Sequence, residues 1–185
     1  MKILLINNNT QHLQNLRKSL VGHDVEIQVY KPGLDFRHRG KDLVILSGGG
    51  GEGLEIFDFF KRGRLWYEDE MNFVRSCDKP ILGICMGYEV IASAYGAKII
   101  EGPQLIEGFK PVKVTKSGQK MLNNEILSQF ESHFWRVTDV SSAFEVMAES
   151  ETGIEGIKHK TKQLFGTQFH PEKGGTIDLF GLLQH

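Results

Sequence analysis

The sequence has few cysteines, no long apolar run and no excess of charge of either sign, and each of these absences excludes a class of protein. Its 185 residues include two cysteines, Cys77 and Cys85, too few for a disulfide framework or a cysteine-rich metal site and typical of a reducing compartment. Lysine and arginine together number 22 and aspartate and glutamate 23, so the formal charge is −1. Such a balance does not favour binding to nucleic acid.

Long apolar stretches are also missing. The run at residues 3–6 is followed by three asparagines, whereas a signal peptide has ~7–15 apolar residues in a row and a membrane-spanning helix ~18 or more. We therefore expect a cytoplasmic protein without a membrane partner. Apolar residues make up 40% of the chain and charged residues 24%, as in ordinary globular proteins. The absence of repeats, low-complexity tracts and linkers predicts a single domain over residues 1–185.

The first half of the chain alternates apolar runs with helical patterns. The apolar runs lie at residues 3–6, 42–47 and 80–85. Helical spacing follows Thr10, and further helices are predicted within residues 54–77 and at 90–95. This alternation predicts an α/β fold with a doubly wound, mostly parallel sheet and helices on both faces. The second half predicts a smaller antiparallel region and a closing helix at 176–183. Its strand-like runs are 112–115, 134–137, 144–148 and 164–169.

Cys85 lies in the sequence GICMG at residues 83–87, where a predicted strand gives way to a helix. This is the cysteine counterpart of the G-x-S-x-G elbow, in which small residues allow a sharp turn that presents the nucleophile. A helix amino terminus favours the thiolate over the thiol, so we expect an activated nucleophile. A buried structural cysteine is the alternative for any single cysteine, and we interpret Cys77 in that way.

His170 follows an apolar strand in the sequence FHPE, which ends at Glu172. Side chains two residues apart share a face of an extended segment, so Glu172 is expected to orient the His170 imidazole. The pair would then complete a nucleophile, base and orienter arrangement with Cys85. Other histidines are interpreted as surface residues, namely His12, His23, His38 and His185.

A run of four glycines at residues 48–51 follows Ser47 at the end of a predicted strand. Glycines there allow backbone N–H groups to turn toward an oxyanion or a phosphate. The run lacks the Lys-Ser/Thr ending of a P-loop, which makes nucleotide phosphate the poorer interpretation.

Three motifs in this order, ILSGGGG, PILGICMGYE and FGTQFHPE, closely resemble the signatures of class I, triad-type glutamine amidotransferases. Within that family the chain looks most similar to the glutaminase part of GMP synthases. The resemblance implies that Cys85 attacks the side-chain amide of glutamine, with His170 as general base and Glu172 as its orienter. Neither a metal nor an organic cofactor is implied.

The resemblance also assigns residues around the substrate. The backbone N–H groups of Gly49 and Met86 would form the oxyanion hole. Ser132 and His133 would match the segment that binds the glutamine backbone. Glu89 stands where the family has glutamine, and a carboxylate accepts hydrogen bonds but cannot donate them. Our hypothesis is that Glu89 selects a ligand with an amine or amide at that point, or lowers glutamine affinity until a partner docks; a favourable acid in the first turns of a helix is the plain alternative.

Two further departures from the family concern the glycine loop and the segment after it. Gly50 stands where the family often has proline, so a looser loop is expected. The chain between Ser47 and Cys85 is longer than the resemblance suggests, and residues 54–77 are rich in aromatic side chains. Three interpretations of this segment stay open: packing in the core, a lid over the thiol, and a docking surface for a partner.

The leading interpretation is a free-standing subunit that hydrolyses glutamine or another γ-glutamyl amide and passes ammonia to a separate synthase, because the chain ends at His185 without an acceptor-activating domain. GMP synthase is the first candidate for the partner, with aminodeoxychorismate and anthranilate synthases behind it. Two alternatives stay open. One is a stand-alone γ-glutamyl hydrolase or peptidase, and the other is a non-catalytic regulatory protein, against which the intact Cys85, His170 and Glu172 argue.

Overall fold

The computed structural model describes residues 1–50 and 67–182, which form a nine-stranded sheet with helices packed on it. The strand order is β2-β1-β3-β4-β9-β8-β7-β5-β6. Most of the aromatic segment at 54–77 lies outside the described residues. Within the described part of this segment, Tyr67 lies in the core and stacks on Tyr30 with 5.0 Å between ring centroids. Within the described residues, no helix combines the length and the apolar character needed to cross a membrane.

One half of the sheet is parallel, as predicted, and its strands are buried on both faces except for the edge strand β2. Its strands are β2 (Asp24–Val29), β1 (Lys2–Asn7), β3 (Leu43–Leu46), β4 (Ile81–Ile84) and β9 (Leu164–Thr167). Residues in the central strands are almost fully inaccessible to solvent, which explains why they read as continuous apolar runs rather than alternating ones.

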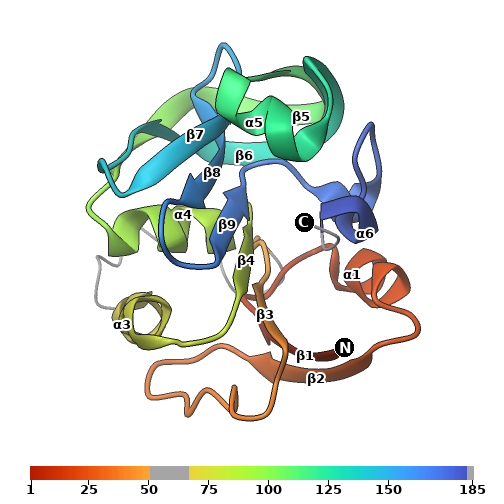
Figure 1. Cartoon of the computed structure of the whole chain (residues 1–185), viewed down its shortest axis with the longest axis vertical. Helices are drawn as coiled ribbons and strands as arrows, with labels where there is room; N and C mark the ends of the chain where they lie inside the picture. Colours follow the sequence, from red (N-terminus) through yellow and green to blue (C-terminus); the bar gives the residue numbers. More distant parts are fainter. Residues whose placement is uncertain (51–66, 183–185) are drawn as a thin grey trace.

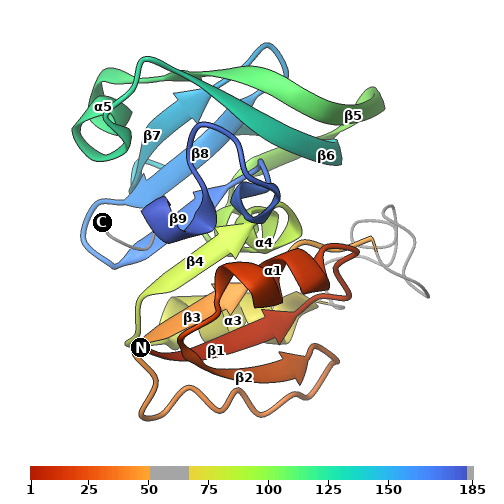
Figure 2. The ribbon, with the colours of Figure 1, turned by 90° about the vertical axis from the view of Figure 1, so that its right-hand side faces the viewer.

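Helices cover both faces of this parallel half (Figure 2). Helix α1 (Leu13–Ser19) packs Leu16 against Ile3 and Leu5 on one face. Helices α3 (Glu68–Ser76) and α4 (Met86–Ala94) pack on the other face, where the alternate β1 residues Leu4 and Ile6 point. Because side chains alternate across a strand, one apolar run supplies both cores. The doubly wound α/β prediction is confirmed.

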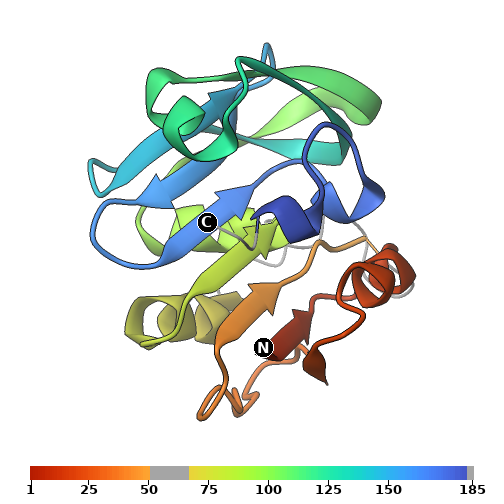
Figure 3. The same cartoon turned by 45° about the vertical axis from the view of Figure 1, so that its right-hand side comes forward.

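The other half of the sheet is antiparallel and continues from β9 (Figures 1 and 3). Strand β9 pairs with β8 (Ile154–His159), followed by β7 (Phe144–Glu149), β5 (Lys98–Val114) and β6 (Ile126–Asp139). Helix α5 (Lys116–Leu122) packs on this half around Met121 and Met147. The chain then passes through a short 3₁₀ turn, Pro171–Lys173, to α6 (Leu179–Leu182), which is shorter than the closing helix predicted at 176–183.

Candidate active site

The turn at Cys85 has the sharp geometry expected of a nucleophile elbow. Cys85 joins β4 to α4 with φ 50° and ψ −108°, a conformation that residues with side chains seldom adopt. The flanking glycines are required by close packing. A Cβ atom on Gly83 would lie 2.6 Å from the Gly87 backbone, and one on Gly87 would lie 2.2 Å from the Leu46 carbonyl oxygen. These glycines therefore allow the first turn of α4 to pack closely against β3 and β4. Cys85 lies at the junction between β4 and α4.

The Cys85 thiol lies in a buried and largely acidic environment. Its side chain is 8% exposed, its S–H donates toward the Ser132 carbonyl at 3.8 Å, and the Gln168 amide donates toward its Sγ at 3.9 Å. Burial raises the pKa of this thiol well above its usual value, and the nearby Glu89, Glu172 and Glu131 carboxylates raise it further. Burial and these carboxylates therefore oppose the helix amino terminus, which favours the thiolate.

His170 and Glu172 form the pair that the sequence predicted. Nδ1 of His170 lies 2.8 Å from Oε1 of Glu172, and both residues are buried, at 2% and 5% exposure. The carboxylate accepts from Nδ1, which leaves Nε2 as the nitrogen with a lone pair. No residue in the described part of the chain bonds to Nε2. Glu172 reaches His170 from the 3₁₀ turn rather than along an extended strand.

The His170 and Cys85 side chains both lie beside Gly48 in the glycine loop. A Cβ atom on Gly48 would lie 3.1 Å from Cε1 of His170 and 3.5 Å from Cβ of Cys85. The carboxyl ends of β3, β4 and β9, which carry these three residues, are neighbours in the parallel half (Figure 3). Glycine at 48 is thus what leaves room for both side chains, at the edge where ligands of such sheets bind.

The two residues expected to form the oxyanion hole are neighbours. A Cβ atom on Gly49 would lie 2.8 Å from Sδ and Cε of Met86, so the glycine loop packs directly on the start of α4. Below this loop, the Ser47 hydroxyl accepts from the Asn8 backbone N–H at 2.9 Å. The Asn8 amide also donates to Oε1 of Glu70 at 3.1 Å.

Glu89 is held by a residue whose role the sequence did not indicate. The Gln168 amide donates to Oε1 of Glu89 at 2.9 Å, and Glu89 is 3% exposed. Burial raises the pKa of Glu89 to about 7. Gln168 therefore lies between the Glu89 carboxyl and the Cys85 sulfur, a position visible only once β9 and α4 are packed together.

His12 was interpreted as a surface residue, and this interpretation is wrong. It is half-buried, and its ring packs edge-on against the His170 ring with centroids 4.8 Å apart. Burial, together with the charge of His170, lowers the pKa of His12 to about 4. His12 is therefore a neutral wall of the site near pH 7. Sequence alone gave no sign of this, because α1 packs close to the turn after His170 only in the folded chain.

Ser132 and His133 lie on β6 beside the thiol. Ser132 contributes its carbonyl to Cys85, whereas His133 is buried and Nδ1 of its ring lies 2.7 Å from the Trp135 carbonyl oxygen. The ring faces two carboxyl groups, Glu131 and Glu155, and the three residues form one of two clusters of metal-ligating side chains among the described residues. The second cluster is His38, Cys77 and Asp78.

Comparison with known proteins finds similar proteins both by sequence and by structure. The family model for "Glutamine amidotransferase class-I" matches residues 4–179. The A subunit of the glutamine-hydrolyzing GMP synthase of Methanococcus maripaludis is 31% identical over 182 residues, covering 94% of this chain and 89% of that protein. The corresponding protein of Methanocaldococcus jannaschii is 30% identical with the same coverage. Among solved structures, a protein of Thermoplasma acidophilum described as a GMP synthase of the same subunit type superimposes with a TM-score of 0.78 and 26% identity, covering 93% of this chain and 84% of that one.

Proposed function

The chain belongs to the class I glutamine amidotransferase family, and from this premise we propose that it is the glutaminase subunit of a GMP-forming synthase. In this role it hydrolyses the side-chain amide of glutamine to glutamate and delivers the ammonia to a synthase partner. The observation that carries the proposal is that the Cys85 and His170 side chains both lie beside Gly48, with Glu172 bonded to Nδ1 of the imidazole. We treat residues 1–185 as one amidotransferase domain.

Cys85 is the nucleophile and His170 is its base in this reaction. The Cys85 sulfur attacks the amide carbon while Nε2 of His170 takes the thiol proton, which the raised thiol pKa makes necessary. The same proton then passes to the leaving nitrogen, and ammonia departs from a γ-glutamyl thioester. Water, deprotonated by His170, next hydrolyses the thioester to glutamate and free thiol. Glu172 holds the imidazole in the tautomer that both steps use.

The negative charge on the carbonyl oxygen needs donors in the tetrahedral intermediates. We assign this role to the backbone N–H groups of Gly49 and Met86, which belong to segments in direct contact. Removal of one such donor typically costs ~3–4 kcal/mol of barrier. The side chains around the rest of the substrate are Glu89 and the Ser132–His133 segment, and the Glu89 carboxyl would face the cationic end of a glutamine molecule.

Support for a GMP-forming partner comes from the relatives. Those that match 94% of this chain are named as one lettered subunit of GMP synthase, which implies a second subunit. One observation favours a different candidate, a stand-alone γ-glutamyl hydrolase. Glu89 replaces the expected glutamine in a fully enclosed position, where a carboxyl favours a ligand with an amine or amide facing it, and γ-glutamyl amides other than glutamine also meet this requirement.

Ammonia release tests both candidates and the regulatory alternative. The purified chain is assayed with glutamine, alone and with the synthase subunit from the same organism. The expected result is ammonia release that is lost in Cys85→Ala, retained in Cys77→Ala and strongly stimulated by the synthase. Release that the synthase does not change would favour the hydrolase. No release from glutamine under either condition would reject the glutaminase and leave a hydrolase of another γ-glutamyl amide or the non-catalytic interpretation.

A further inference from the structure

Glu131, His133 and Glu155 form a buried cluster, and the proposed glutamine chemistry gives its two carboxyl groups no role. Glu131 and His133 are two residues apart on β6 and so point to the same side, and Glu155 approaches from β8. Their exposures are 2%, 3% and 1%, and one ligand atom from each lies within 4.8 Å of the others.

The tautomer of His133 is fixed by its backbone partner. Nδ1 lies 2.7 Å from the Trp135 carbonyl oxygen, which can only accept, so Nδ1 carries the hydrogen. In the neutral ring, Nε2 then presents a lone pair to Oε2 of Glu131, 3.2 Å away. This pair lacks hydrogen-bond geometry. Two lone pairs facing each other in a buried space repel unless a proton or a metal ion lies between them.

Glu155 is oriented toward the same space. Its Oε1 accepts from the hydroxyls of Ser150 and Thr152, at 2.5 and 2.8 Å, while Oε2 has no hydrogen-bond partner. Both oxygens of Glu131 are also without a hydrogen bond. Across residues 1–50 and 67–182, the ion pairs include no lysine or arginine bound to either carboxylate. Two buried carboxylates without a cation are costly unless they take up protons or bind an ion.

We propose that Glu131, His133 and Glu155 bind one divalent transition-metal ion of the zinc type. Two carboxylates and one imidazole are a donor set that suits such an ion better than magnesium, which prefers oxygen ligands and retains water. Tetrahedral zinc ligands are ~3.4 Å apart, close to the 3.2 Å between His133 and Glu131. The bonds from His133 to a carbonyl and from hydroxyls to Glu155 are the outer contacts that orient metal ligands in proteins.

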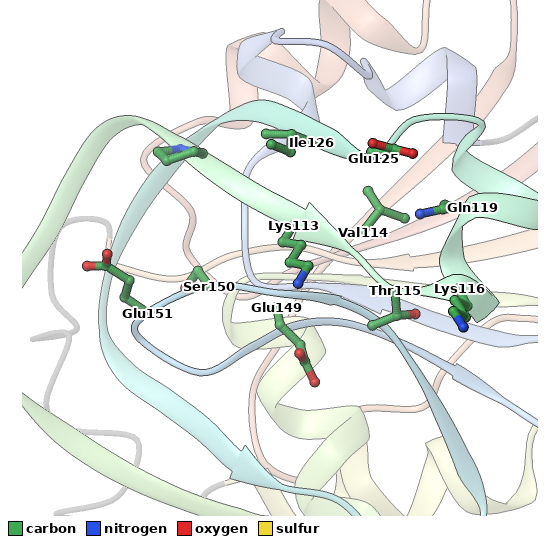
Figure 4. A pocket seen from close by; sticks show the side chains of 11 residues that line it. Lys113, Val114, Thr115, Lys116, Gln119, Glu125, Ile126, Glu149, Ser150 and Glu151 are labelled. Carbon is green, nitrogen blue, oxygen red and sulfur yellow. The ribbon is translucent and has the colours of Figure 1, made fainter.

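One residue that bonds to the cluster also lines a surface pocket. The pocket, of about 810 Å³, opens beside β5, β7 and α5, and Ser150 forms part of its wall (Figure 4). The Ser150 hydroxyl bonds to Glu155. A bound ion would also fix Ser132, which lies between the two β6 ligands and contacts the Cys85 thiol.

Metal titration of the whole chain tests this site without reference to glutamine. Chelator-treated protein is titrated with zinc chloride by calorimetry, with manganese and magnesium chlorides for comparison, and its Tm is measured with and without zinc. We expect one zinc ion per chain, a raised Tm, and affinity for zinc at least tenfold above that for magnesium. Glu131→Gln and Glu155→Gln should each weaken zinc binding more than ~tenfold.

The matched control is His38→Asn, which removes a ligand of the other cluster and should leave the tight zinc site unchanged. Binding that disappears in His38→Asn but persists in Glu155→Gln would overturn the proposal, as would the absence of any zinc-dependent change in the parent protein. If Glu131→Gln or Glu155→Gln fails to fold, as judged by circular dichroism, the site is tested instead by anomalous diffraction from zinc-soaked crystals of the parent protein. An anomalous peak among the three side chains is expected, and an empty site would reject the assignment.

Discussion

Cys85 differs from a typical activated cysteine in the charges that surround it. After burial, the carboxylates of Glu89, Glu172 and Glu131 raise the pKa of the thiol, and Glu89 raises it most. Removal of the Glu89 charge should therefore lower that pKa, although burial keeps it above the usual value. The Glu89 carboxyl has a pKa of about 7, so its effect on Cys85 is largest above neutral pH.

We predict that Glu89→Gln speeds the alkylation of Cys85 by iodoacetamide at pH 8. A lower thiol pKa raises the fraction of reactive thiolate at pH 8, and we expect a rate increase of about three- to tenfold. The measurement uses a Cys77→Ala background so that one thiol reacts, and it follows adduct mass with time. Below pH 6 the two proteins should react at similar rates, since Glu89 is then mostly neutral. A uniform increase at both pH values would indicate greater access to the thiol instead of a charge effect.

Candidate site residues that belong to short sequence motifs were predicted from the sequence. Residues that are brought together only by packing were not. The GICMG and FHPE motifs indicated Cys85, His170 and Glu172 because strand ends, glycines and a spacing of two are local features. The partnership of His12 with His170 and of Gln168 with Glu89 joins segments far apart in the chain. The Glu131–His133–Glu155 cluster likewise exists only after β6 packs near β8.

At the scale of elements, the central parallel strands were predicted almost in full. Among the antiparallel strands, β7 was predicted almost in full, β5 and β6 only in part, and β8 not at all. Strands β1, β3 and β4 are buried on both faces and appear as short apolar runs. Strand β5 spans Lys98–Val114, of which the sequence indicated only the end, because most of its residues are exposed and two prolines and two glycines interrupt the pattern. Its long pairing with β6 is a nonlocal interaction, and such pairings stabilise strands with little local signal.

Helix α4 packs on β3 through a contact that allows no side chain. The Gly87 N–H donates to the Ser47 carbonyl at 3.1 Å, and a Cβ at this position would lie 2.2 Å from the Leu46 carbonyl oxygen. We predict that Gly87→Ala destabilises the protein by about 3 kcal/mol or more, because backbone on both sides must move.

Urea unfolding at constant pH measures this loss of stability. Gly181→Ala is the control, since a Cβ there would make only an ordinary contact, 3.4 Å from an Asp178 oxygen, and alanine is favoured over glycine within a helix. Equal stability of the two variants would mean that α4 shifts without cost and that the elbow tolerates a wider separation.

Four buried glutamates in the described part of the molecule have carboxyl groups that are protonated more readily than in water. Burial raises the pKa of Glu70 and Glu131 to about 8 and that of Glu89 and Glu155 to about 7. A carboxyl with a raised pKa in the folded state binds its proton more tightly there than in the unfolded chain. Its stabilising contribution is therefore complete below the unfolded pKa near 4.5 and is lost as the pH rises through the folded value.

Glu70 allows this effect to be measured away from the proposed active-site and metal residues. It lies on α3, is fully buried, and its one hydrogen bond among the described residues comes from the Asn8 amide. Because the folded pKa of Glu70 is about 8 against 4.5 for the free group, the parent protein should lose stability between pH 5 and pH 8. Glutamine at this position keeps an acceptor for Asn8 and carries no charge at any pH.

We therefore predict that Glu70→Gln is more stable than the parent at pH 8 by about 1–3 kcal/mol, and close to the parent at pH 5. Chemical unfolding of metal-free protein at both pH values gives the two differences. Glu107→Gln, at an exposed position, should unfold like the parent at either pH. Parallel loss of stability in Glu70→Gln and the parent between pH 5 and pH 8 would contradict the prediction, because it would mean that Glu70 is already ionised in the folded protein and that water or an ion reaches its second oxygen.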